Sequence, residues 1–225
     1  MQATMRRGSQ TDIRLGLKVL KGKFEEASAI YEELKSSGER EVVYWVWTAS
    51  PRYSLDPLYY LNNEERVGSV ARLPPQDPRG WTAYGFSKNN RIVVEHQYLA
   101  DLQGRRYETF YSETEECIFG YHFHHDASLG LINCAALRFL GHTPIQYQKW
   151  AVRGWVSCNF VALDGRIRSF NEVFKQGDEP QKRISGEIRY KDNGQLEVWT
   201  KWPGARTLEL TFRGISPAEN PFLRQ

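Results

Sequence analysis

The chain has 225 residues, of which 40% are hydrophobic and 25% charged, proportions that indicate a globular protein and exclude disorder as its main state. Its 30 basic and 27 acidic residues leave a net charge of only +3, so we do not expect nucleic acid as a partner. No stretch reaches the roughly 20 apolar residues of a membrane-spanning helix, and residues 1–15 lack the apolar core of a secretory signal. The sequence therefore predicts a cytoplasmic protein without a membrane segment.

Residues 1–40 form the first predicted unit, a helical segment that packs on the rest of the protein. Apolar residues recur there at steps of four and three, along one stripe of a helix: Ile13, Leu17, Leu20, Phe24, Ala27, Tyr31 and Leu34. Glycine at position 22 costs a helix about 1 kcal/mol. The pattern therefore allows one weakened helix or two short helices that join at 21–23, and Gly38 is the expected end.

Part of this segment, from Gly22 to Leu34, resembles the second helix of a tetratricopeptide repeat. Ala27 and Tyr31 stand four residues apart after a Gly-Lys-Phe-Glu-Glu start, as in that repeat. Such a repeat buries its apolar face against neighbouring copies, and no second copy follows in this chain. We therefore prefer an amphipathic helix that packs on a sheet or covers its edge.

From residue 41 onward, short segments of alternating polar and apolar residues return about every dozen residues, with turn signals between them. The expected strands are 41–49, 57–62, 65–73, 80–87, 91–99, 105–112, 116–125, 130–140, 145–150, 152–162, 166–174, 183–191, 195–202 and 206–213. They predict a mainly β fold with an N-terminal helix, in which a long antiparallel meander of about a dozen strands forms a curved sheet, a sandwich or an open barrel. We expect this β domain to span 41–217 and residues 218–225 to be a flexible tail. The proline-rich stretch 74–80 is a loop or, less favoured, a domain boundary.

Three tight turns fix the expected pairing of their flanking strands. A Lys88-Asn89-Asn90 loop places Phe86 opposite Ile92, with Asn90 in the left-handed conformation. An Asp164-Gly165 turn places Ala162 opposite Ile167. An Asp192-Asn193-Gly194 loop keeps each face of its hairpin uniform by pairing residues as follows: Lys191 with Gln195, Tyr190 with Leu196, Arg189 with Glu197 and Ile188 with Val198.

Two of these hairpins, Tyr190-Lys191-Asp192-Asn193-Gly194-Gln195-Leu196 and Leu163-Asp164-Gly165-Arg166-Ile167, share an order of residues: an aromatic or apolar strand, an Asp/Asn/Gly turn, then Arg or Gln before Ile or Leu. This order resembles the tyrosine-aspartate hairpin repeats of Rhs-type proteins. By analogy, the resemblance implies a small β-rich inhibitor or immunity protein of a bacterial toxin.

A histidine cluster is the strongest candidate for a metal site. On a strand, His122 and His124 point to the same face and form a possible pair of ligands for one divalent metal ion. A third ligand must come from another strand, and His96 or Glu108 is a candidate. The alternative is that these histidines lie half exposed at a strand end and bond to neighbouring tyrosines.

Sequence motifs for other chemistry are missing: the chain has no GxSxG elbow, no GxGxxG and no phosphate-binding loop. We therefore expect a non-catalytic protein without a cofactor, whose aromatic-rich β surface recognises a protein partner. The candidate surface rings are Trp81, Tyr84, Tyr107, Tyr111, Trp150, Trp155, Trp199 and Trp202, for each of which a place in the core is the alternative. The second hypothesis is a metal-dependent enzyme or a lipocalin-like binder of small molecules that uses His122, His124 and His96 inside a β cavity.

Overall fold

A computed structural model describes residues 10–59, 69–100, 106–125, 129–163, 166–190, 196–202, 206–209 and 221–222, of which 10–15, 129, 196–202 and 206–209 are described by their backbone alone. The two helices are α1 Gln10–Ala27 and α2 Tyr31–Glu41. The strands are β1 Tyr44–Thr48, β2 Val70–Ala71, β3 Thr82–Phe86, β4 Ile92–Tyr98, β5 Arg106–Glu113, β6 Cys117–His125, β7 Leu129–Leu140, β8 Thr143–Ala151, β9 Gly154–Leu163, β10 Arg166–Gln176, β11 Lys182–Tyr190, β12 Leu196–Trp202 and β13 Arg206–Glu209.

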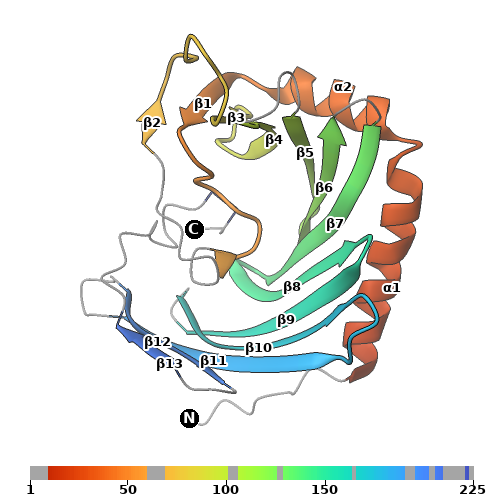
Figure 1. The fold of residues 1–225 in the computed structure, drawn as a ribbon, viewed down its shortest axis with the longest axis vertical. Helices are drawn as coiled ribbons and strands as arrows, with labels where there is room; N and C mark the ends of the chain where they lie inside the picture. Colours follow the sequence, from red (N-terminus) through yellow and green to blue (C-terminus); the bar gives the residue numbers. More distant parts are fainter. Residues whose placement is uncertain are drawn as a thin grey trace.

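All strands belong to one antiparallel sheet with the order β13-β12-β11-β10-β9-β8-β7-β6-β5-β4-β3-β1-β2. From β3 to β13 each strand pairs with the next one along the chain, so the predicted meander is confirmed. The sheet curves strongly but stays open, with β2 at one edge and β13 at the other (Figure 1). The proline-rich stretch 74–80 lies between two strands that both pair with β1, so it is a loop within the sheet.

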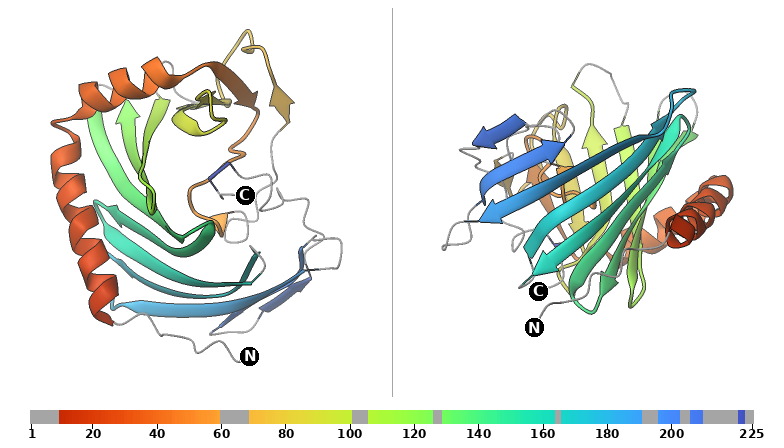
Figure 2. Two further views of the ribbon diagram at one scale, coloured as in Figure 1. Left: turned by 180° about the vertical axis from the view of Figure 1, so that it is seen from behind. Right: turned by 90° about the horizontal axis from the view of Figure 1, so that it is seen from below.

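The two helices lie against the convex face of the sheet (Figures 1 and 2). The chain breaks between them at 28–30, so the junction predicted at 21–23 is wrong, and Gly22 lies inside α1. Gly38 does not end α2 either: a Cβ at this position would lie 2.8 Å from Val94 Cγ2, so the glycine lets the helix approach β4 closely. Among the described residues, neither helix is both long enough and apolar enough to cross a membrane.

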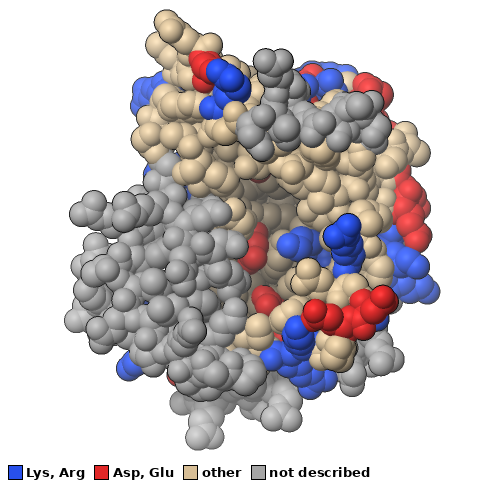
Figure 3. Space-filling model, in the orientation of Figure 1, with Lys and Arg blue, Asp and Glu red and all other residues tan. Residues whose placement is uncertain are grey.

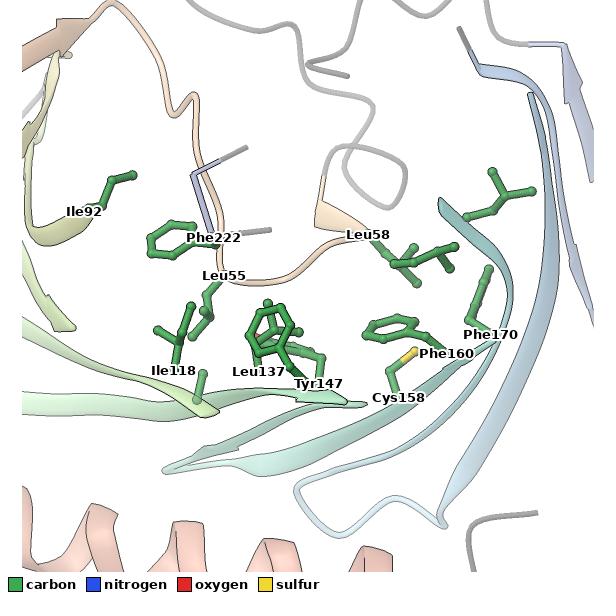
Figure 4. Packing of buried hydrophobic residues seen from close by; sticks show 14 of the residues in the cluster. Leu55, Leu58, Ile92, Ile118, Leu137, Tyr147, Cys158, Phe160, Phe170 and Phe222 are labelled. Carbon is green, nitrogen blue, oxygen red and sulfur yellow. The ribbon is translucent and has the colours of Figure 1, made fainter. Parts of the chain in front are cut away.

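Apolar side chains bury on both faces of the sheet. The convex core, under the helices, consists of Leu20, Ala27, Tyr31, Val93, Val94, Phe110, Cys117, Tyr121, Phe123, Cys134 and Ala136. It includes three residues of the predicted helical stripe. The concave core is larger and includes Leu55, Leu58, Ile92, Ile118, Leu137, Tyr147, Cys158, Phe160, Phe170 and Phe222 (Figure 4). A sheet that is covered on both faces explains why many of the rings are structural.

The cover of the concave face comes from residues 49–59, here named the covering segment. The sequence predicted a strand over 57–62, but the described part of it, 57–59, is a turn followed by a helical residue, Tyr59. Local hydrogen bonds explain the difference: Ser54 Oγ accepts from the Asp56 amide at 3.1 Å, and Asp56 Oδ1 accepts from the Leu58 amide at 2.9 Å. Leu55 and Leu58 then reach into the concave core. Of the predicted strand 65–73, the described residues form a strand only over Val70–Ala71.

The chain end also reaches the concave core. Phe222 is only 2% exposed, and its ring centroid lies 4.6 Å from that of Tyr111. The prediction of a flexible tail over 218–225 is therefore wrong at this residue. Burial of the apolar Phe222 ring is favourable in free energy and holds this part of the chain end in place. Residues 218–220 and 223–225 lie outside the described residues.

The hairpin predictions are confirmed in part. Phe86 pairs with Ile92, Ala162 pairs with Ile167, and Asn90 has a φ of 57°. Tyr190 pairs with Leu196 as expected, but a bulge next to it pairs Arg189 with Val198 and Ile188 with Trp199. The predicted register of this hairpin is therefore correct for the Tyr190–Leu196 pair and wrong for Arg189 and Ile188. The turn residues 164–165 and 191–195 lie outside the described residues.

Candidate functional site

A row of polar side chains crosses the concave face at its centre. Glu95 of β4 pairs with Thr109 of β5, Thr109 with His122 of β6, and His122 with Asn133 of β7. Directly opposed residues of neighbouring strands point to the same face. These four side chains, here named the polar row, therefore stand side by side where apolar residues would be expected.

Two small residues beside the polar row leave room above the sheet. Gly120 pairs with Ala135, and this pair is flanked by Tyr111 on one side and Lys149 on the other. The covering segment lies over part of this space and leaves an open cavity of about 260 Å³. The lining residues are Pro51, Tyr53, Ser54, Leu55, Asp56, Tyr59, Glu95, Gln97, Thr109, Tyr111, Gly120, His122, Asn133, Ala135, Tyr147 and Lys149. The described surface on this side is hollowed near its centre, with acidic and basic side chains around the hollow (Figure 3).

Glu95 is a carboxyl of the cavity whose surroundings oppose its ionisation. The Tyr111 hydroxyl donates a hydrogen bond of 2.7 Å to Glu95 Oε2. Desolvation outweighs this bond and raises the pKa of Glu95 to about 7. Near neutral pH the cavity therefore holds a carboxyl group that is part protonated and part ionised, which is the property of a general acid or base.

His122 is held in place by two contacts. Its Nδ1 lies 2.8 Å from Thr109 Oγ1, and its ring stacks on Tyr107 at a centroid distance of 5.1 Å. Desolvation, with the positive charge of Lys149 next in size, lowers the pKa of His122 to about 4. The imidazole is therefore neutral at physiological pH, so one of its ring nitrogens donates and the other accepts.

Asp56 and Lys149 add charge to the cavity from opposite sides. Burial raises the pKa of the Asp56 carboxyl, and the bond from the Leu58 amide and the charge of Lys149 oppose that rise. Asp56 comes from the covering segment, whereas Lys149 comes from β8 in the sheet. The cavity is thus lined by a cation, carboxyl groups, neutral hydrogen-bond donors and acceptors, and several tyrosine rings. Proteins bind polar organic molecules with this combination of groups.

The three histidines predicted to bind a metal ion do not lie on one face of the sheet. His122 and His124 lie on the concave face, but His96 pairs with Glu108, and Glu108 pairs with Phe123, which points to the convex face. His96 is therefore on the other side of the sheet from His122 and His124, so the predicted three-histidine site is wrong. In the part of the chain that the structure describes, no group of three or more His, Cys, Asp or Glu side chains is arranged to hold a metal ion.

His96 belongs instead to a buried charge cluster on the convex face, centred on Glu108. Glu108 Oε1 lies 2.6 Å from Arg106 Nη2 and 3.5 Å from His96 Nε2, and Oε2 lies 2.8 Å from His125 Nε2. The Tyr31 hydroxyl of α2 donates a hydrogen bond of 2.6 Å to Oε2. Desolvation opposes ionisation, but the bond from Tyr31 and the positive neighbours outweigh it and lower the pKa of Glu108. This cluster fastens α2 to the sheet.

The predicted surface rings are largely part of the packing. Tyr84 is fully buried, its hydroxyl accepting from the Arg52 amide, and Tyr111 bonds to Glu95 beneath the covering segment. The other described rings, Trp81, Tyr107, Trp150 and Trp155, are half-buried. The side chains of Trp199 and Trp202 lie outside the described residues. Of the six rings whose side chains the structure describes, Tyr111 alone lines the cavity.

The sequence prediction missed Glu95, Thr109, Asn133, Asp56 and Lys149. One signal was present: Glu95 directly follows the apolar run Ile92-Val93-Val94 within one strand, and a carboxylate is rarely buried without a partner. The other residues have no such signal, because their convergence depends on the register of the strands β4 to β8 and on the path of the covering segment. No model of a known protein family matches the chain, and no curated protein sequence matches it either.

Proposed function

We propose that this protein binds a small polar organic molecule in the cavity of the concave face. The observation that carries this proposal is the polar row beside Gly120 and Ala135, which places unlike hydrogen-bonding groups around an open pocket of about 260 Å³. Natural ligand sites are usually somewhat larger, so the expected ligand is compact. This is the small-molecule half of the second hypothesis from the sequence, with His122 as a neutral ligand-binding group.

The chemistry of the lining indicates which molecules fit. Lys149 favours an acidic group, and the tyrosine rings Tyr53, Tyr59 and Tyr147 favour a flat or partly apolar body. Glu95 accepts a hydrogen bond when ionised and donates one when protonated. A small weak acid with an additional N–H or O–H group satisfies all three features.

A fragment screen by NMR tests the proposal. Small polar acids, added one at a time to isotope-labelled protein, are expected to shift the amide signals of Thr109, His122 and Asn133. Ala135→Leu places extra methyl groups in the cavity and is expected to abolish these shifts. Ala71→Leu, the same substitution on the edge strand β2 and away from the lining residues, is the matched control and is expected to retain them. Equal binding by both variants would locate the ligand elsewhere and contradict the proposal.

Recognition of a protein partner by aromatic side chains, and with it the immunity-protein analogy, stays a prediction. Of the rings chosen for that surface, Tyr84 is buried and Tyr111 packs against the concave core, whereas Trp81, Tyr107, Trp150 and Trp155 are half-buried. Among the described side chains, the large apolar ones that are exposed are other residues: Val19, Val43, Tyr44, Val70, Leu73, Leu140, Val152 and Leu163. These are scattered over helix, strands and loops, a distribution that is normal for a protein surface. The cavity therefore gives the better-supported function.

A further inference from the structure

Two side chains of opposite charge line the cavity, and neither has an ion partner among the described residues. Glu95 has one hydrogen-bond partner there, the Tyr111 hydroxyl at 2.7 Å, and no described basic side chain lies within ion-pair distance of it. The Lys149 ammonium forms no ion pair with a described side chain either, and its charge acts on Asp56 and His122 from a greater distance. Both charged groups are therefore available to a ligand.

These two groups stand on opposite sides of the cavity. Glu95 belongs to β4 and Lys149 to β8, with β5, β6 and β7 between them in the sheet. The intervening strands contribute Thr109, His122 and Asn133, which are neutral hydrogen-bonding groups. When Glu95 is ionised, the cavity is therefore negative at one end and positive at the other.

An ionised Glu95 lacks a positively charged neighbour. Removing a carboxylate from water is costly unless a counter-ion or several hydrogen-bond donors replace the lost hydration. Tyr111 supplies one donor, and desolvation still raises the pKa of Glu95 to about 7. Glu108 on the convex face has Arg106 Nη2 at 2.6 Å, and its pKa is lowered. A cationic group of a ligand would give Glu95 the partner that no described side chain provides.

Tyrosine rings at the Glu95 end of the cavity also suit a cation. Tyr84 pairs with Glu95 across β3 and β4, and its ring centroid lies 5.0 Å from that of Tyr53, which lines the cavity. Tyr111 lines the same end and is bonded to Glu95. The face of a tyrosine ring attracts an ammonium group through its negative quadrupole. The carboxylate and the rings therefore favour the same kind of ligand group.

We infer that the ligand is a small zwitterion, whose protonated amine pairs with Glu95 and whose carboxylate pairs with Lys149. The inference rests on the proposed function and deepens it, because it names the class of molecule that the same cavity binds. An amine alone or an acid alone would leave one of the two charges without a partner. With a zwitterion bound, the four charges sum to zero. Small amino acids have this chemistry.

The pH dependence of binding distinguishes a zwitterion from a simple acid. An ordinary amine and carboxyl keep their charges between about pH 5.5 and about pH 8, whereas Glu95 ionises in this range. The affinity for a zwitterion is expected to rise with pH by up to about 30-fold, because only the ionised Glu95 attracts an ammonium group. The affinity for an acid without an amine is expected to fall by up to about tenfold, because the ionised Glu95 repels it.

Other titratable groups of the cavity change little in this pH range, with one exception. The pKa of His122 is about 4, and burial raises the pKa of Tyr111 and Tyr147 well above their usual value. Burial also raises the pKa of Asp56, so a contribution from this carboxyl must be separated by mutation of Glu95. The titratable or charged side chains around Glu95 are Tyr84 of β3, Tyr111 of β5, His122 of β6, Tyr147 and Lys149 of β8, and Tyr53, Asp56 and Tyr59 of the covering segment.

Matched pairs of probes test the inference by NMR titration. Glycine, β-alanine, γ-aminobutyrate and p-aminomethylbenzoate are zwitterions of increasing length. Acetate, propionate, butyrate and p-methylbenzoate are their analogues without the amine. At pH 8 at least one zwitterion is expected to shift the amide signals of Thr109 and Asn133 and to bind about tenfold more tightly than its analogue. The two affinities are expected to change with pH in opposite directions.

Three variants assign the charges of the ligand to their partners. Glu95→Gln keeps a polar side chain without the charge and is expected to abolish both the preference for the zwitterion and its rise with pH. Lys149→Gln is expected to weaken the zwitterion and its analogue alike, by about tenfold. Glu187→Gln, at an exposed position of β11 outside the lining residues, is the matched control and is expected to bind as the wild type does.

The inference would be overturned if, in every pair at pH 8, the acid without the amine bound as tightly as its zwitterion. A preference for the zwitterion that persists in Glu95→Gln would overturn it as well. Both results leave the proposed function intact, because a ligand still occupies the cavity. Failure of every probe to bind, or binding that Ala135→Leu does not weaken, would contradict the proposed function and the inference together. The pH series on the wild-type protein needs no variant to fold.

Discussion

Glu95 of β4 and Glu108 of β5 lie on adjacent strands but point to opposite faces of the sheet, and their pKa values move in opposite directions. Glu108 is fully buried among Arg106, Tyr31 and two histidines, and its pKa is lowered. Glu95 has one hydrogen-bond donor, Tyr111, and its pKa rises to about 7. Desolvation raises the pKa of both carboxyls, so the neighbouring groups decide whether the pKa ends above or below its usual value.

The comparison separates a structural face from a functional one. The convex face satisfies its buried carboxylate with partners from α2, β4, β5 and β6, which ties these elements together. The concave face leaves Glu95 beside an open volume. A buried charge with many partners stabilises the fold only in the ionised form, whereas one with few partners is costly to ionise and available for proton transfer.

The largest effect is expected from removing the convex carboxylate. Glu108→Ala leaves the partly exposed Arg106 without its partner and the buried Tyr31 hydroxyl without its acceptor, so we expect the free energy of unfolding at pH 7 to fall by about 3–5 kcal/mol. Urea denaturation measures the change, with Glu116→Ala, an exposed loop position, as the control that should change little.

Because the folded pKa of Glu108 lies below the unfolded value, its stabilisation is present above about pH 4 and is lost as the pH falls further. A loss that is independent of pH would contradict the ionic role.

Removal of the carboxylate on the concave face is expected to increase the free energy of unfolding. Glu95→Gln keeps an acceptor for Tyr111 but removes the cost of ionisation, so we expect the free energy of unfolding to rise by up to about 3 kcal/mol at pH 8. Because the folded pKa of about 7 exceeds the unfolded value, wild-type stability declines as the pH rises from about 4 to about 7 and is then level. At pH 4 the two proteins should be nearly equal. Urea denaturation over this pH series checks the prediction, and a variant less stable than the wild type at pH 8 would refute it.

A smaller effect is expected from one hydroxyl of the convex cluster. Tyr31→Phe removes the donor to Glu108 Oε2, a hydrogen bond to a charged group, and should cost about 1.5–3 kcal/mol. The control is Tyr44→Phe, whose hydroxyl bonds to Asn90 Oδ1 on the exposed surface and whose loss should be much smaller. Thermal and urea unfolding of both variants measure the difference. Similar losses in the two would mean that the Tyr31 bond does not secure α2.

The smallest effect concerns how the helices rest on the convex face. Gly22→Ala in α1 meets nothing within 4 Å, so the higher helix propensity of alanine should raise the free energy of unfolding by about 1 kcal/mol. The same substitution at Gly38 in α2 should lower it, because the new methyl group would meet Val94 at 2.8 Å and Phe110 at 3.4 Å. Circular dichroism during urea unfolding compares the two. A gain at both positions would show that α2 can move off the sheet freely.

Local chemistry explains what the sequence predicted correctly. Alternation and turn residues lie within a few positions of one another, so the meander and the Phe86–Ile92 pairing follow from short segments. Asn90 takes the left-handed conformation because asparagine tolerates it in a tight turn. These features need no knowledge of distant parts of the chain.

The faces of the sheet could not be predicted in the same way. The alternation of polar and apolar residues shows which residues of one strand point to the same side of the sheet. It does not show which residues of another strand point to that same side. The connection from β4 to β5 is too long to fix a register, and a bulge between His122 and Phe123 changes the pairing again. His96 therefore falls opposite Glu108 rather than beside His122. The polar row depends on the same long-range registers.

The concave core has a consequence for how the protein folds. Neighbouring strands of the meander pair through contacts between residues close in the chain, so hairpins are expected to form early. The cover of the polar row takes its place only when Leu55 and Leu58 join the same core cluster as Phe222, which lies more than 160 positions further along the chain. We therefore expect refolding in two steps, in which the sheet and its helices form first and the binding cavity is the last part of the molecule to be completed.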